Sequence, residues 1–150
     1  MACNNNWNKI LPTGREESTA REVQVGKTDY YMFIPYTDKI VGGWGEDGQQ
    51  YQISHIDTTI KKGLVFLNFV RRYPEGKDPY LKNIKRIETS KFFISDAKWK
   101  VYQFDTTIEF ITSYNIDETY QAVAIINSKS EQEAAIYLSM FATLHKKTER

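Results

Sequence analysis

The sequence has 150 residues, 41% of them hydrophobic and 14% aromatic, and a formal net charge of +1. This length suits one domain with one core, and the near-zero charge provides no electrostatic excess that would attract nucleic acid or an anionic membrane. Cys3 is the single cysteine, which excludes an internal disulfide and a zinc site built from several cysteines.

The N-terminal 22 residues are polar and contain Pro12 and Gly14, so we expect a tether (1–22) before a single α+β domain (23–150). Ala2 and Cys3, followed by three Asn residues, resemble the junction at which bacterial lipoproteins are acylated, with a start Met in place of the signal. This predicts lipidation at Cys3 and a location in the bacterial periplasm, anchored to a membrane by lipid. The alternative is a cytoplasmic protein with an incidental cysteine.

Strand signals then follow one another along the chain, because apolar residues alternate with polar ones and turn residues separate the runs. The run at 63–70 is apolar at nearly every position, which is typical of a central strand covered on both faces. The expected strands are 23–34, 50–56, 63–70, 91–95, 98–104, 107–114 and 119–126, with a turn at Ser95-Asp96 between the fourth and fifth.

Two helices are expected. Asp78 and Pro79 can open a short one in which Leu81, Ile84 and Ile87 recur at helical spacing. A stronger one closes the domain, with a capping box at Ser130 and Glu133. Its apolar stripe is Ala134, Tyr137, Leu138, Phe141, Leu144 and His145, and Lys146 and Lys147 suit its negative C-terminal end.

These elements predict an α+β fold. We expect an antiparallel sheet packed by the C-terminal helix and by the shorter helix.

The stretch GGWGEDG, residues 42–48, matches the pattern G-x-G-x-x-G of nucleotide-binding turns. A dinucleotide turn must open a helix, yet the following residues have a strand pattern, and Glu46 and Asp47 carry negative charge where phosphates would lie. The kinase version lacks its lysine strand and its catalytic motifs. The stretch is therefore interpreted as a connection between two strands, in which glycine supplies positive φ.

Residues that could carry chemistry are few. His55 and Asp57 form an H-x-D pattern on an expected strand, so their side chains would share a face, with His145 as a third metal ligand if the closing helix covered that face. No nucleophile motif accompanies the serines, and Cys3 lies in the expected tether. We therefore predict a protein that is not an enzyme and has no cofactor, with a small-ligand or metal binder around His55 and Asp57 as an alternative.

Exposed aromatic and charged residues favour protein binding instead. Trp44 lies at an expected loop tip with Glu46 and Asp47, where it either folds onto the core or anchors a partner. Lys98 and Lys100 flank Trp99 on an expected strand, so both lysines would lie on the opposite face from Trp99, together with Tyr102. Such a face could bind an acidic surface. Stacking of RNA on it is disfavoured by the near-neutral charge.

Two segments resemble the family that contains the PsbP photosystem proteins and the DcrB-type bacterial lipoproteins. Residues 119–147 are similar to the strand, turn and helix that close those domains, and residues 30–44 are similar to their opening. The resemblance implies a twisted antiparallel sheet packed by helices in the manner of an α/β/α sandwich. It also implies a non-enzymatic envelope domain that binds a protein partner, most concretely an immunity protein that neutralises a secreted toxin. The alternative is a structural or assembly lipoprotein of a secretion system or another envelope complex.

Overall fold

The computed structural model describes residues 20–45, 48–60, 62–72, 78 and 80–147. Within this part of the chain, no helix has the length and apolar character needed to cross a membrane. The elements are β1 (Ala20–Gln24), β2 (Tyr30–Pro35), β3 (Asp38–Gly45), β4 (Gly48–His55), β5 (Leu64–Arg71), the 3₁₀ turn η2 (Leu81–Asn83), β6 (Ile84–Phe92), β7 (Ser95–Gln103), β8 (Ile108–Asn115), β9 (Tyr120–Ser128), α3 (Glu131–Phe141) and β10 (His145–Lys146).

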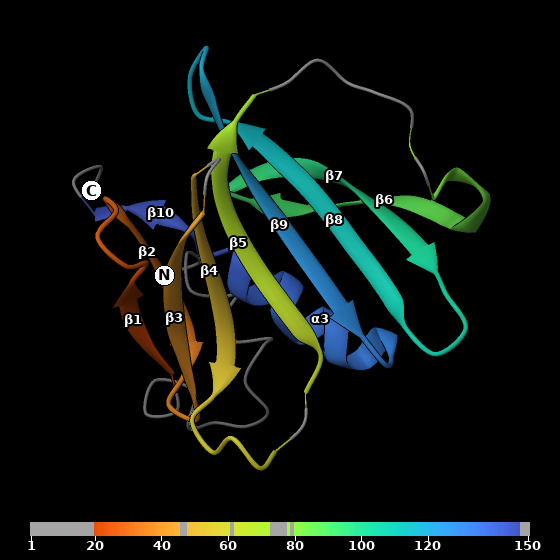
Figure 1. Cartoon of the computed structure of the whole chain (residues 1–150), viewed down its shortest axis with the longest axis horizontal. Coiled ribbons are helices and arrows are strands. Elements are labelled where there is room, and N and C mark those ends of the chain that lie inside the picture. Colours follow the sequence, from red (N-terminus) through yellow and green to blue (C-terminus); the bar gives the residue numbers. More distant parts are fainter. Residues whose placement is uncertain (1–19, 46–47, 61, 73–77, 79, 148–150) are drawn as a thin grey trace, which may run out of the picture.

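Within the described residues, the larger sheet is antiparallel and has seven strands in the order β3-β4-β5-β9-β8-β7-β6 (Figure 1). A smaller antiparallel sheet has the order β1-β2-β10. The predicted α+β class and the antiparallel sheet are thus confirmed, although helix contributes little. Because β1 begins at Ala20 and pairs with β2, the folded domain starts earlier than the expected boundary at residue 23.

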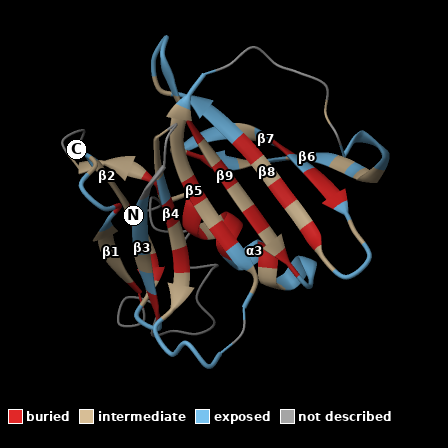
Figure 2. Ribbon diagram, viewed as in Figure 1, coloured by how far each residue is buried: buried red, intermediate tan, exposed pale blue. Residues whose placement is uncertain are grey.

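The core lies between the large sheet and α3, which lies behind the strands in Figure 2. On β9, Ala122 and Ala124 are fully buried, and their small side chains let the helix approach the sheet closely. α3 also contacts β6 and β2, which belong to opposite ends of the fold, so strands on both sides close around the helix. Trp99, Phe92 and Phe141 pack against one another in this core.

The C-terminal helix begins as predicted. The Ser130 hydroxyl accepts the Glu133 N–H at 3.1 Å, while the Glu133 carboxylate accepts the Lys129 N–H rather than that of Ser130. The predicted helix is too long, however, since α3 ends at Phe141. The Thr143 hydroxyl donates to the Met140 carbonyl and accepts the N–H of Phe33, which turns the chain into β10.

The expected short helix over residues 78–87 is wrong. A single 3₁₀ turn occupies Leu81–Asn83, and β6 begins at Ile84. Leu81 and Ile87, two members of the supposed apolar stripe, are 63% and 58% exposed. The chain forms a strand here because β6 pairs with β7 from Ser95 to Tyr102, and this pairing overrides the helical spacing. On the face of β6 that points inward, Arg86 reaches the start of α3 and donates to Glu131 at 2.6 Å.

The turn between β6 and β7 lies at Phe93-Ile94 rather than at the predicted Ser95-Asp96. Both residues have positive φ, 56° and 65°, which bulky or β-branched residues rarely adopt. Ring contacts with Tyr30 and Tyr114 hold Phe93 in place, whereas Ile94 is 60% exposed. The turn was not predicted because Phe and Ile are residues that favour strands.

The expected central strand at 63–70 is β5, which lies between β4 and β9. Its burial differs from the prediction, because Val65 and Leu67 are buried and Leu64 is 51% exposed. One face of β5 thus meets the core, and the opposite face stays partly open.

Candidate functional site

Lys98 and Lys100 lie on β7 and are exposed, whereas Trp99 between them is fully buried. The predicted orientation of these three residues is confirmed. Neither lysine forms an ion pair with any residue that the structure describes. Two ammonium groups of like charge therefore stand on the face of the sheet opposite α3.

The pairing of β7 with β8 stops beside these lysines. β7 begins at Ser95 and β8 continues to Asn115, yet the two strands pair only over residues 100–103 and 108–111. β7 remains paired with β6, and β8 with β9, beyond this point. In place of the ladder, the buried hydroxyl of Thr112 donates to the Lys98 carbonyl at 2.7 Å.

The separation of the two strands leaves a groove of about 780 Å³, which we call the β7–β8 groove. It is lined by residues of the four strands β6, β7, β8 and β9: Phe92, Ser95, Asp96, Ala97, Lys98, Lys100, Tyr102, Ile111, Thr112, Ser113, Tyr114, Gln121 and Val123. Ile111 lies directly across from Lys100 and gives the groove an apolar part. The one carboxylate among these residues, that of Asp96, faces Lys91 at 3.5 Å.

Tyr102, the third residue predicted for this surface, lines the groove but is 4% exposed. Its hydroxyl donates to the Asp78 carboxylate at 2.6 Å. Burial and this hydrogen bond raise the pKa of Tyr102 to about 12. The hydroxyl therefore anchors Asp78 to β7 and is not free for a partner.

Residues 42–45 of the stretch GGWGEDG end β3 and Gly48 begins β4, so the stretch joins two antiparallel strands, as interpreted. The expected loop tip at Trp44 is wrong, because the backbone of this residue belongs to β3. Gly48 has a φ of +150°, and a Cβ there would come within 2.0 Å of the Phe69 carbonyl oxygen, so glycine is required. The backbone of Trp44 pairs with Gln49. Its side chain, and both Glu46 and Asp47, lie outside the described residues, as does Cys3.

His55 and Asp57 do not share a strand face, because β4 ends at His55. The Nδ1 atom of His55 accepts the Asp57 N–H, and the Asp57 carboxylate accepts from Thr59. His145 lies elsewhere, with Glu22 at 2.7 Å. In the described ranges, no three His, Cys, Asp or Glu side chains come together as metal ligands would.

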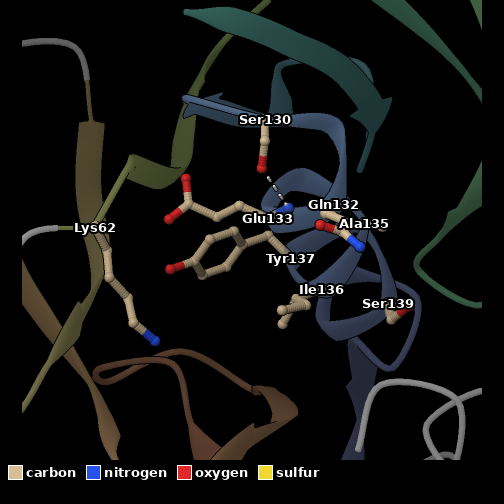
Figure 3. A pocket seen from close by; sticks show the side chains of 8 residues that line it. All are labelled: Lys62, Ser130, Gln132, Glu133, Ala135, Ile136, Tyr137 and Ser139. Carbon is tan, nitrogen blue, oxygen red and sulfur yellow. Dashed lines mark hydrogen bonds between the residues drawn. The ribbon is translucent and has the colours of Figure 1, made fainter. Parts of the chain in front are cut away.

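A second cavity, of about 630 Å³, lies beside α3, and sequence reasoning missed it. Figure 3 shows Lys62 and the Tyr137 hydroxyl pointing toward the same space. Beside Lys62, Asp38 is 1% exposed: one of its carboxylate oxygens has no hydrogen-bond partner, and Lys62 lies 3.8 Å from the other. Burial raises the pKa of Asp38 despite the nearby Lys62, and burial also raises that of Tyr137.

Comparison with known proteins adds no assignment to these two cavities. The chain matches no protein-family model, and comparison with curated proteins and with solved structures finds no significant match. The resemblance to the PsbP and DcrB family therefore stays a prediction.

Proposed function

We propose that this chain is a non-enzymatic protein-binding domain and that the β7–β8 groove is its contact surface. The observation that carries the proposal is the pair Lys98 and Lys100, which line a groove of about 780 Å³ and form no direct ion pair with a described residue. A described carboxylate that interacts with Lys100 is that of Asp78, whose pKa is lowered by the Tyr102 hydroxyl and, to a smaller degree, by Lys100. Exposed lysines beside an apolar wall attract an acidic surface and favour its approach.

The biological setting is also a proposal. We infer a periplasmic lipoprotein acylated at Cys3, of the immunity type, which blocks a secreted toxin; the alternative is an assembly lipoprotein of an envelope complex. Support comes from Ala2-Cys3 and from the resemblance at residues 30–44 and 119–147. The α/β/α sandwich of that family belongs to the same proposal, since α3 covers one face of the described sheet.

Partner capture tests the proposed surface. The double variant Lys98→Glu with Lys100→Glu is compared with Lys27→Glu with Lys39→Glu, which makes the same change of charge at exposed positions that do not line the groove. A partner protein that is cross-linked to the unmodified chain in the native host should no longer be captured by the first variant, and it should still be captured by the second. Equal capture by both variants would remove the groove from the proposal.

The setting has its own tests. Incorporation of a clickable palmitate into the full-length protein should disappear with Cys3→Ser, and labelling that persists would refute acylation at this residue. A toxin gene beside this one favours the immunity protein, and rescue of cells expressing that toxin would establish it. A secretion operon favours the assembly lipoprotein.

The alternative function, binding of a small ligand, was expected around His55 and Asp57, and we now propose the cavity beside α3 as the site instead. The observation that favours this cavity is Tyr137, a residue that is 3% exposed and lines it. A shift of the Tyr137 ring signals in NMR spectra upon addition of a metabolite extract would support a ligand there, and unchanged signals would end this alternative.

A further inference from the structure

The two outer strands of the large sheet differ in how their free edges are protected. β6 carries the exposed lysines Lys85 and Lys91 and a register shift between Ile84 and Arg86, and such features discourage a further strand from pairing. β3 pairs with β4 without a register shift, and its residues 40–43 include no charged residue and no proline. The edge of β3 is therefore open to pairing.

Two contacts establish which backbone groups of β3 point toward this free edge. The Thr37 carbonyl accepts the Ile56 N–H at 2.7 Å, so the backbone of residue 37 points toward β4. The Asp38 carbonyl accepts from the Arg21 guanidinium at 3.0 Å and points the other way. Because the backbone groups of successive residues alternate between the two edges of a strand, the even-numbered residues of β3 turn their N–H and C=O away from β4.

These groups lack a partner within the part of the chain that the structure describes. β3 has no neighbour in its sheet besides β4, and the structure shows no hydrogen bond to the outward N–H and C=O of Ile40 and Gly42. Gly42 is exposed, as are Lys39 and Val41 beside it. The edge thus offers a further strand two donors and two acceptors, one of each from Ile40 and from Gly42.

The side chains of β3 favour a second copy of the same strand as the partner. An antiparallel pair of identical strands has two-fold symmetry, so it closes as a dimer. If Val41 lies opposite its own counterpart, Ile40 of each copy lies opposite Gly42 of the other, and every outward N–H and C=O of these two residues finds a partner. Lys39 then lies opposite Gly43 rather than opposite the second lysine. This register places no like charges opposite each other, and the glycine leaves room beside Ile40.

We propose that the free edge of β3 pairs antiparallel with β3 of a second copy of this chain, with Val41 opposite Val41, so that two sheets join into one. This dimer goes beyond the proposed function and does not depend on it. It leaves the proposed contact surface accessible, because β4, β5 and β9 lie between β3 and the β7–β8 groove.

Charged substitutions at Val41 test both the pairing and its register. Val41 is 47% exposed, and its backbone points toward β4, so Val41→Lys and Val41→Glu leave the ladder with β4 in place. In analytical ultracentrifugation under reducing conditions, the unmodified chain should dimerise below about 1 mM. Each variant alone should stay monomeric in this range, because like charges would lie opposite each other, and an equimolar mixture of the two should dimerise at least about tenfold more tightly than either alone.

Ile87→Lys is the matched control, since it introduces the same charge at an exposed apolar residue of the other outer strand. This variant should dimerise as the unmodified chain does. Dimerisation of Val41→Lys at the strength of the unmodified chain, or a mixture of the Lys and Glu variants that stays monomeric, would refute the proposed pairing.

Amide hydrogen exchange tests the pairing without any substitution. Between about 10 µM and about 1 mM chain, the N–H groups of Ile40 and Gly42 should come to exchange at least about fivefold more slowly, while those of Lys39 and Val41, which face β4, stay unchanged. Protection of Ile40 and Gly42 that does not depend on concentration would show that the same chain covers this edge, and it would overturn the second copy. A chain that remains monomeric at about 1 mM would overturn it as well.

Discussion

The turn at Phe93-Ile94 stores backbone strain that a pair of substitutions can measure. Ile94 has a φ of 65°, and a left-handed conformation costs a non-glycine residue about 1–2 kcal/mol. Glycine avoids this cost but loses about 0.5–1 kcal/mol more backbone entropy than alanine on folding. Ile94→Gly and Ile94→Ala remove nearly the same side-chain contacts. The glycine variant should therefore be the more stable of the two, by about 0.5–1 kcal/mol.

Urea denaturation followed by tryptophan fluorescence measures this difference as a midpoint higher by about 0.3–0.5 M, for a slope of about 2 kcal/mol/M. Thr89 on β6 provides the control, since it is exposed and lacks positive φ. There the order should reverse, with Thr89→Gly less stable than Thr89→Ala by about 0.5–1 kcal/mol. The same order at both sites, with alanine the more stable, would refute the argument that residue 94 is strained.

Three further substitutions test the polar contacts, each by urea denaturation. Thr112→Val should lower stability by about 1–2 kcal/mol, because it leaves the Lys98 carbonyl without its donor; an unchanged midpoint would show that water replaces the hydroxyl. Since the folded pKa of Asp38 is raised, its charge opposes folding at neutral pH. Asp38→Asn should stabilise the protein there, and the advantage should vanish as the pH falls below the ordinary value of 3.8; an advantage that grows toward acid would contradict this. Hydrogen bonds from Lys147 and His145 outweigh burial and lower the pKa of Glu22. Its contribution is thus present above the ordinary value of 4.5 and lost as the pH falls through the folded pKa, so the deficit of Glu22→Gln should shrink in acid, and a constant deficit would refute it.

Features that depend on neighbouring residues alone could be predicted from the sequence. The orientation of Lys98, Trp99 and Lys100 follows from the alternation of any strand. The helix cap at Ser130 depends only on a hydrogen bond to the Glu133 N–H, three positions along the chain, and on no tertiary contact. The strands on either side of GGWGEDG could be predicted for the same reason, because apolar and polar residues alternate within each of them.

Features that depend on distant residues were missed. The spacing of Leu81, Ile84 and Ile87 fits a helix, but β7 supplies a pairing edge that only the folded chain provides. Asp38 is buried at the start of β3, where Lys62 lies 3.8 Å from its carboxylate and Tyr137 of α3 interacts with it electrostatically. A pattern of neighbouring residues in the sequence cannot predict an interaction between residues that lie about a hundred positions apart.

The β7–β8 groove combines both kinds of information. Phe92 and Trp99 pack against Phe141, which draws the first half of β7 toward α3. β8 stays paired with β9 as far as Asn115, so the two strands must separate. The same packing that closes the core thus opens the groove. Lys98 lies on the unpaired part of β7, and Lys100 lies on the last pair of the ladder with β8. Because Trp99 between them is buried, both lysine side chains point to the outer face of the sheet.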